Sequence, residues 1–326
     1  MRIGIIGAGA LGSYLGYKLN AGGHEVVLHD RMKRVKEIRR DGLRLKDVIS
    51  GEIVSADLPV EEELIGDFDV LISAVRAHQL ADVLTEDKAV ETAEGDHEGA
   101  AGVPLFFIGS YVSGMGDWAE ALGPERVLFG FPGMSAVLDK DDQGALVKFC
   151  ERGEKDTEPW GITVGALRGP VPEKQTAICR GLNDSGIPVH HAESMESVFL
   201  SQAFVRLPML AALEYAGGTL DRLSGRGDLL KLMIKAIREG LAAVKRSGLK
   251  PVPDSLEMYR WVPIFISANM IKHRLDTVPS KIGIEMFAHR AGDELRFLGG
   301  EFLEFTVASG AEFEHLEYLL GGLEEE

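Results

Sequence analysis

The chain has 326 residues, a formal net charge of −16, 45% hydrophobic residues and 26% charged residues. This length suits two domains with a sizeable hydrophobic core, and the acidic balance disfavours a nucleic-acid partner, which needs a basic face. The two cysteines, Cys150 and Cys179, form no CxxC pair, and no stretch reaches the roughly 18 uninterrupted apolar residues of a membrane span. We therefore expect a cytoplasmic protein with reduced thiols and no membrane partner.

Strands alternate with helices through the first part of the chain. Residues 2–6 are predicted to form a buried strand, followed by a Gly-rich turn and a helix that ends at Gly22 and Gly23. Further elements are predicted as strands at 24–29, 69–75, 104–108, 126–130 and 187–190, and as helices from 79 and over 173–182. This alternation is typical of parallel βαβ units.

Two later segments depart from the alternation. Residues 145–150 and 161–165 flank a charged stretch, and we interpret them as an antiparallel hairpin at the edge of the sheet. From residue 193 onward, apolar residues recur at helical spacing over 194–216, 227–247, 254–274 and 281–306. The predicted fold class is therefore α/β, with an N-terminal Rossmann-type, doubly wound parallel sheet over residues 1–192. An all-helical substrate and dimerisation domain is predicted over residues 193–326.

The strongest motif is a Gly-rich turn between the first strand and the first helix. Its sequence is Gly7-Ala8-Gly9-Ala10-Leu11-Gly12, the GxGxxG pattern in the context that a dinucleotide-binding fold requires. The first glycine allows a tight turn, the second lets the backbone approach a pyrophosphate, and the third lets the helix pack on the strand. We therefore predict that these residues bind a dinucleotide, the binding set being Gly7, Gly9, Ala10, Leu11 and Gly12. FAD is the rival ligand, but the remaining sequence lacks features of FAD domains.

The end of the second strand carries conflicting signals for the choice of nucleotide. Asp30 can accept hydrogen bonds from the ribose hydroxyls of NAD and repel a 2′-phosphate. The cations that follow, Arg31, Lys33 and Arg34, could instead hold the 2′-phosphate of NADP. The density of this basic cluster favours NADP slightly, and NAD remains open.

Several segments resemble the ketopantoate reductase family. They are Gly7 to Gly12 with Gly16, Gly23 to Val26 leading to Arg31, Ser73 to Gln79, Ser113 to Gly116, and Gly123 to Val127. The resemblance implies a Rossmann domain followed by a helical domain like the C-terminal domain of 6-phosphogluconate dehydrogenase. It also implies NADP as cofactor, contacted by Arg31, Val75, Arg76 and Ser113.

The resemblance fails at the family's substrate residues. Family members carry a Lys and two Asn, spaced four residues apart, on the first long helix of the second domain, with a Pro after the last Asn. Counting back from Pro208 places Leu207, Ala203 and Phe199 at these polar positions. We therefore expect a less polar substrate than ketopantoate.

Other polar residues could act on a carbonyl in their place. Gln202 and Arg206 lie four apart on one helix face, and Arg206 could polarise a carbonyl oxygen without donating a proton. Glu294 matches the family's substrate-contacting Glu. A solvated Gln–Arg face and structural salt bridges are the alternatives. His190 and His191, which end the last predicted strand, could donate a proton or form a structural pair.

Glu285 and His289 are spaced like a metal pair, but the spacing suggests no further ligand, so no metal is predicted.

The sequence leaves two functions open. The first is an NAD(P)-dependent oxidoreductase acting on a small keto or hydroxy compound, as a monomer or a homodimer. The second is a dinucleotide-binding sensor or regulatory protein without turnover.

Overall fold

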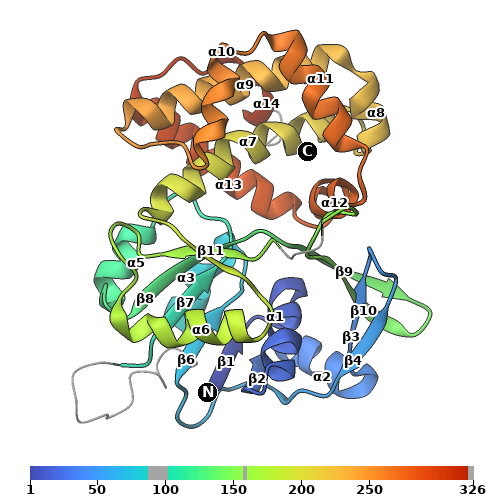
Figure 1. Ribbon diagram of the computed structural model, residues 1–326, viewed down its shortest axis with the longest axis vertical. Coiled ribbons are helices and arrows are strands. Elements are labelled where there is room, and N and C mark those ends of the chain that lie inside the picture. The colour runs from blue at the N-terminus through green and yellow to red at the C-terminus, as the bar shows by residue number, and fades with distance from the viewer. Residues whose placement is uncertain (87–101, 157–159, 322–326) are drawn as a thin grey trace. The chain divides into compact units, whose positions relative to one another are not determined.

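The computed structural model describes residues 1–86, 102–156 and 160–321, which divide into two compact units (Figure 1). The Rossmann unit contains residues 1–109 and 116–195, and the helical unit contains residues 110–115 and 196–326. The junction after residue 195 lies close to the predicted boundary. Residues 110–115 pack with the helices instead, although their place in the sequence put them in the first domain.

The Rossmann unit is built on an eight-stranded sheet of order β12-β11-β8-β7-β6-β1-β2-β5. Every neighbouring pair is parallel except β11 and β8, which are antiparallel. Its strands are β1 Arg2–Ile6, β2 Glu25–His29, β5 Val60–Glu61, β6 Val70–Ser73, β7 Leu105–Ile108, β8 Val127–Pro132, β11 Ile162–Gly165 and β12 Val189–His191. This is the doubly wound order predicted from the alternating elements.

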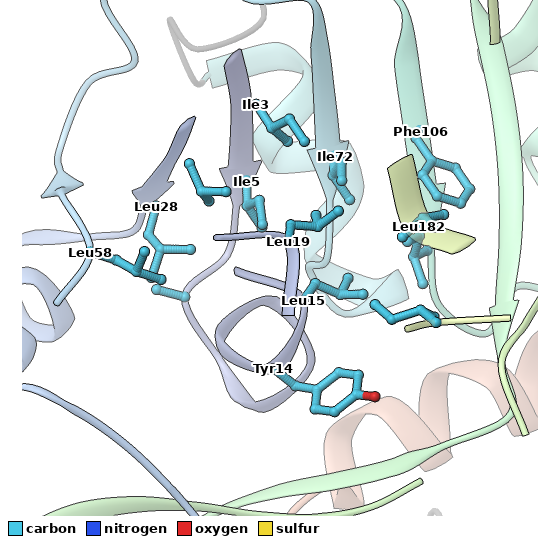
Figure 2. Packing of buried hydrophobic residues seen from close by; sticks show 14 of the residues in the cluster. Ile3, Ile5, Tyr14, Leu15, Leu19, Leu28, Leu58, Ile72, Phe106 and Leu182 are labelled. Atoms are coloured by element: carbon cyan, nitrogen blue, oxygen red, sulfur yellow. The ribbon is translucent and has the colours of Figure 1, made fainter. Parts of the chain in front are cut away.

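Helices cover both faces of this sheet. They are α1 Ala10–Ala21, α2 Met32–Asp41, α3 Ala77–Glu86, α5 Met115–Leu122 and α6 Thr176–Asp184, which follows the short η2 Glu173–Gln175. Figure 2 shows Leu15 and Leu19 of α1 and Leu182 of α6 on the face that carries Ile5 and Phe106. Neighbouring residues of a strand point to opposite faces, and Phe107 accordingly packs with Trp118 of α5, their rings 6.5 Å apart.

The predicted edge hairpin is wrong. A second, four-stranded sheet has the order β4-β3-β10-β9, formed by β3 Leu43–Asp47, β4 Ile53–Ala56, β9 Ser135–Asp141 and β10 Gly144–Cys150. β10 pairs with β9 across a tight turn, whereas β11 joins the main sheet beside β8. The turn is built by Asp141, which accepts a hydrogen bond from the Gln143 N–H at 2.9 Å, and by Gly144 at φ 111°.

A buried polar network ties the end of the second sheet to the first helix. Glu151, directly after β10, accepts hydrogen bonds from the Tyr14 hydroxyl at 2.6 Å and from Lys18 Nζ at 3.2 Å. Burial and the Glu151 charge raise the pKa of Tyr14, so its hydroxyl stays a donor. This network anchors α1, the helix that begins at the Gly-rich turn.

The helical unit is all-helical where it is described beyond residue 195, as predicted. Its elements are α7 Met195–Tyr215, α8 Leu220–Gly225, α9 Gly227–Arg246, η3 Asp254–Glu257, α10 Met258–Trp261, α11 Ile264–Leu275, α12 Val278–Ser280, η4 Lys281–Met286, α13 Gly292–Ser309 and α14 Glu314–Gly321. The segments predicted over 254–274 and 281–306 are each broken. Pro263 caps the start of α11, and η4 is a π-helix that ends before α13.

The long helix α7 is the one described helix that is long and apolar enough to cross a bilayer. Of that apolar stretch, 72% is buried in the folded protein. α7 also continues through Pro208 without a break. This burial accounts for its apolar character, as in the core helix of a globular protein.

Candidate functional site

The Gly-rich turn forms a cradle of backbone groups at the start of α1. Gly7 has φ 96°, a left-handed conformation suited to glycine, and its N–H donates to the His29 carbonyl at 2.9 Å. A methyl group added at Gly12 would lie 1.9 Å from the Gly7 carbonyl oxygen, whereas one added at Gly9 would meet nothing within 4 Å. Gly12 therefore seals the turn against the helix, and Gly9 leaves open space beside it.

Backbone N–H groups line the start of α1. The first intrahelical bond runs from the Ser13 N–H to the Gly9 carbonyl at 3.0 Å, so the amides of Ala10, Leu11 and Gly12 precede it. These three amides stand at the positive end of the helix dipole. The turn thus has the donor set that binds a diphosphate in dinucleotide folds.

The Ala8 carbonyl is held in place by two side chains. Arg34 Nε donates to it at 2.9 Å and the Ser13 hydroxyl donates to it at 3.1 Å. Arg34 also forms an ion pair with Glu37 at 2.7 Å. These bonds fix the orientation of the turn before any ligand binds.

Asp30 lies next to this turn at the end of β2. Its N–H donates to the Glu61 carbonyl at 3.2 Å, and its Oδ1 accepts from the Arg31 N–H at 2.8 Å. The preceding residue, His29, holds Gly7. Asp30 is therefore fixed beside the Gly-rich turn, whereas the Arg31 side chain is exposed.

The end of β6 borders the turn on the other side. The Ala74 N–H donates to the Ile6 carbonyl at 2.8 Å, and a methyl group at Gly7 would lie 3.0 Å from Val75 Cγ1. Arg76 is exposed at the start of α3. The structure thus brings Gly7, Asp30 and Val75 to one edge of the sheet, where the carboxyl ends of β1, β2 and β6 meet.

Ser113, predicted to contact the cofactor, lies in the segment that packs with the helical unit. Its hydroxyl donates a hydrogen bond to the Glu301 carboxylate on α13. Burial raises the pKa of Glu301, and the bonds from Ser113 oppose this shift. Glu301 had no sequence signal, because its partner lies 188 residues earlier in the chain.

We expect Glu301→Gln to change the pH dependence of stability. A carboxyl group whose pKa is raised by folding favours the folded state below its unfolded pKa of about 4.3 and loses that contribution as the pH rises through the folded value. The variant should therefore be stabilised relative to the wild type at pH 7.5 but not at pH 4, as measured by denaturant unfolding. Glu312→Gln, at an exposed site on the same unit, is the control. Equal effects of both substitutions at pH 7.5 would contradict the role assigned to burial.

Arg206 and Glu294 share one environment in the helical unit. Arg206, on α7, places its guanidinium 5.4 Å from the centroid of the Phe287 ring. Burial lowers the pKa of Arg206, and the Glu294 charge opposes this shift. Glu294, in the first turn of α13, is 7% exposed. An arginine with a lowered pKa still carries its charge at neutral pH. The Arg206 guanidinium is therefore a positive charge with Glu294 as its acidic neighbour and the Phe287 ring beside it.

Tyr111 joins this cluster from the segment after β7. Its ring meets Phe199 of α7 edge-on at 5.2 Å. Burial and the Glu294 charge raise the pKa of Tyr111, so its hydroxyl stays protonated. Neither Tyr111 nor Phe287 was predicted: the first lies in a loop, and the second follows a π-helix that apolar periodicity does not signal.

The neighbouring positions on α7 separate into core and polar sides. Phe199, Ala203 and Leu207, the apolar residues that the sequence analysis placed at the substrate positions, are 1%, 8% and 4% exposed. Gln202 and Arg206 are only partly buried. α7 continues through Pro208, and it brings Arg206 close enough to Glu294 for the two charges to interact.

Two of the remaining candidates, Glu285 and His190, have structural partners. Glu285 Oε2 accepts a hydrogen bond from the Leu220 N–H at 2.8 Å, at the start of α8. His190 and His191 both lie exposed on the edge strand β12. The Nε2 atom of His190 is 3.1 Å from the Trp160 carbonyl oxygen. Within residues 1–86, 102–156 and 160–321, no three His, Cys, Asp or Glu side chains gather as a metal site. The prediction of no metal stays a prediction.

Known proteins resemble the chain locally in sequence and throughout in fold. Residues 3–92 match the family described as Ketopantoate reductase PanE/ApbA. The 2-dehydropantoate 2-reductase of Bacillus subtilis is 34% identical over 85 residues, 26% of this chain and 28% of that protein. The 2-dehydropantoate 2-reductase of Lactococcus lactis is 48% identical over 62 residues, 19% of each chain. The matches therefore span less than a third of these curated relatives.

Solved structures extend the likeness to the whole chain. The 2-dehydropantoate 2-reductase of Geobacter metallireducens has a TM-score of 0.75 at 16% identity, covering 100% of this chain and 99% of its own. A D-mandelate dehydrogenase solved with NADH and anilino(oxo)acetate has a TM-score of 0.73 at 17% identity, covering 99% and 97%. The chain is therefore similar to the ketopantoate reductase PanE/ApbA family over residues 3–92, and it shares its fold throughout with a 2-dehydropantoate 2-reductase and a D-mandelate dehydrogenase.

Proposed function

We propose that the protein is an NAD(P)-dependent oxidoreductase that interconverts a small 2-oxo acid and the corresponding 2-hydroxy acid. The observation that carries the proposal is the Gly-rich turn, in which Gly12 seals the helix against the strand and Gly9 leaves open space. Such a turn has a clear physical purpose when a diphosphate lies against it. A bound nicotinamide supplies or accepts the hydride.

The Rossmann unit contributes binding and orientation. The amides of Ala10, Leu11 and Gly12 hold the diphosphate, and Asp30 faces the adenosine ribose. The Ala8 carbonyl, held by Arg34 and Ser13, keeps the turn in its binding conformation. Val75, which packs against Gly7, supports the other side of the turn.

The helical unit contributes the substrate residues. Arg206 binds the carboxylate of the substrate or polarises its carbonyl oxygen, because it is a fixed positive charge with a forked set of donors. Glu294 keeps this guanidinium oriented, and Gln202, one turn earlier on α7, supplies a neutral hydrogen-bonding group. Arg206 cannot act as the proton donor, because it does not release its proton near neutral pH.

The surroundings of Arg206 favour an apolar or aromatic substrate over ketopantoate. Phe287 lies against its guanidinium, and Phe199, Ala203 and Leu207 leave no buried polar partner at the family's substrate positions. An aromatic 2-oxo acid would combine a carboxylate for Arg206 with an apolar body for these walls. The D-mandelate dehydrogenase of similar fold, solved with anilino(oxo)acetate, supports this substrate class.

Nucleotide titration followed by a turnover assay tests the proposal. Tryptophan fluorescence of the full chain is followed during titration with NADH and with NADPH, and nucleotide oxidation is then followed with phenylglyoxylate and with ketopantoate. We expect saturable binding and faster turnover of phenylglyoxylate. If neither NADH nor NADPH binds, the proposal is overturned.

The same assay separates the second candidate function, a dinucleotide-binding sensor. The observation that favours it is that buried apolar side chains, Phe199, Ala203 and Leu207, stand where the resemblance to the family places a Lys and two Asn, the Lys being the group that protonates the keto oxygen in family members. Tight binding with no turnover across a panel of aliphatic and aromatic 2-oxo acids would favour the sensor. Turnover of any of them would exclude it.

A further inference from the structure

The cations after β2 differ sharply in what they do in the folded protein. Arg34 has a side chain only 11% exposed, and its guanidinium is divided between the Ala8 carbonyl and Glu37. Its Nε donor holds the Gly-rich turn, and another of its nitrogens pairs with a carboxylate that neutralises its charge. Arg34 is therefore committed to positioning the turn, and its charge is already balanced by Glu37.

The other two cations extend into solvent. Arg31 and Lys33 are both exposed, and in the part of the chain that the structure describes neither forms an ion pair. A flexible, exposed cation gains little from pairing with an anion, since water and salt screen it and its side chain loses freedom. These two residues thus offer only a weak attraction to a 2′-phosphate.

Asp30 is the fixed charge at this position. Its backbone N–H is bound to the Glu61 carbonyl, and the Arg31 N–H holds one oxygen of its carboxylate at 2.8 Å. The backbone bond between His29 and Gly7 sets its distance from the Gly-rich turn. No ion pair neutralises Asp30 among the described residues, so its carboxylate is an unbalanced negative charge at the end of β2.

We propose that the protein prefers NAD(H) over NADP(H) and that Asp30 determines this preference. The inference rests on the proposed function, since it concerns the dinucleotide that the Gly-rich turn would hold. A carboxylate at this point accepts hydrogen bonds from the 2′- and 3′-hydroxyls of the ribose. With a 2′-phosphate in place of the 2′-hydroxyl, the bond is lost and two negative charges approach each other.

The test compares the dissociation constants of NADH and NADPH for the wild type and for Asp30→Ser, measured by fluorescence titration without substrate. A repulsion of this kind corresponds to about a tenfold to hundredfold difference in affinity. We expect the wild type to bind NADH at least tenfold more tightly, and Asp30→Ser to reverse or abolish that ratio. Serine still accepts a hydrogen bond from the Arg31 N–H, and a thermal melt checks that the variant is folded.

Two outcomes overturn the inference while leaving the proposed function intact. One is a wild type that binds NADPH as tightly as NADH. The other is an Asp30→Ser variant with an unchanged affinity ratio. Failure of both nucleotides to bind the wild type overturns the proposed function and the inference together.

Arg34→Gln provides the matched comparison. Because Arg34 positions the Gly-rich turn and does not contact the 2′ position, the substitution should weaken NADH and NADPH binding by the same factor. A loss confined to NADPH would show that Arg34 binds the 2′-phosphate and would contradict the inference. The affinity ratio thus distinguishes a positioning role from a specificity role, which a change in stability alone could not do.

Discussion

Gly9→Ala is expected to weaken dinucleotide binding by roughly 10- to 100-fold while leaving the fold intact. The added methyl group meets nothing within 4 Å, and Gly9 has an ordinary φ of −72°, so the folded protein accommodates alanine. The open space that receives the methyl group is the space into which a diphosphate would approach the backbone. The free energy of unfolding should stay within about 0.5 kcal/mol of the wild-type value. Fluorescence titration with NADH should show the loss of affinity.

Gly12→Ala is expected to fail in the opposite way. Its methyl group would lie 1.9 Å from the Gly7 carbonyl oxygen, a backbone atom that cannot move without opening the turn. We expect a loss of at least about 1–3 kcal/mol in the free energy of unfolding, typical of overpacking. Gly227→Ala, at an exposed glycine with open space around it, is the control for both the Gly9→Ala and the Gly12→Ala variants.

A Gly9→Ala variant that binds NADH like the wild type would show that the turn holds no diphosphate.

The Gly-rich turn could be predicted from the sequence because its residues are contiguous. The strand, the turn and the helix of residues 2–21 pack against one another through contacts between residues close in the sequence, which the spacing of Gly7, Gly9 and Gly12 allows. The same holds for the parallel order of the sheet, which follows from alternating strands and helices. Local patterns of this kind survive folding almost unchanged.

The second sheet could not be predicted, because its strands come from distant parts of the chain. β3 pairs in parallel with β10, so that Leu45 lies opposite Val147 about a hundred residues later. The sequence pattern of each strand indicates a strand but does not indicate which other strand it pairs with. The apparent hairpin over 145–165 was therefore assigned by proximity in the sequence, whereas its two strands belong to different sheets.

The cluster of Arg206, Glu294 and Phe287 was predicted in part. Helical spacing placed Gln202 and Arg206 on one face of α7, and the family resemblance indicated Glu294. The proximity of Arg206 to Glu294 and to Phe287 depends on how α7, η4 and α13 pack, which periodicity does not encode. The commitment of Arg34 to the Ala8 carbonyl was equally hidden, although it decides how the basic cluster after β2 should be interpreted.

Arg206→Met should abolish most of the turnover while leaving nucleotide binding unchanged. Methionine keeps an apolar stem against Phe287 but removes the charge that would hold a substrate carboxylate or a developing oxyanion. Loss of such a preorganised donor costs about a hundredfold to a thousandfold in kcat/KM. The NADH dissociation constant should not change, because the predicted nucleotide residues other than Ser113 lie in the Rossmann unit. Steady-state kinetics with phenylglyoxylate and NADH titration together check both halves of the expectation.

Stability must be separated from catalysis in this experiment, because Arg206→Met leaves the buried Glu294 carboxylate without its cationic neighbour. Removing one member of a fully buried pair costs about 3–5 kcal/mol, and the partial exposure of Arg206 reduces that figure. The double variant Arg206→Met/Glu294→Gln removes both charges, so it should recover thermal stability without recovering turnover. Lys272→Met, at an exposed cation of α11, serves as the control for loss of positive charge.

Arg206→Lys distinguishes charge from geometry at the same position. Lysine keeps the positive charge but lacks the planar fork that grips a carboxylate at two points and stacks on an aromatic ring. If Arg206 binds the substrate carboxylate through its fork, the lysine variant should show a KM raised about tenfold or more, with a smaller change in kcat. If Arg206 acts mainly by polarising the carbonyl, kcat should fall instead. Wild-type kinetics in both the lysine and the methionine variants would remove Arg206 from the substrate site.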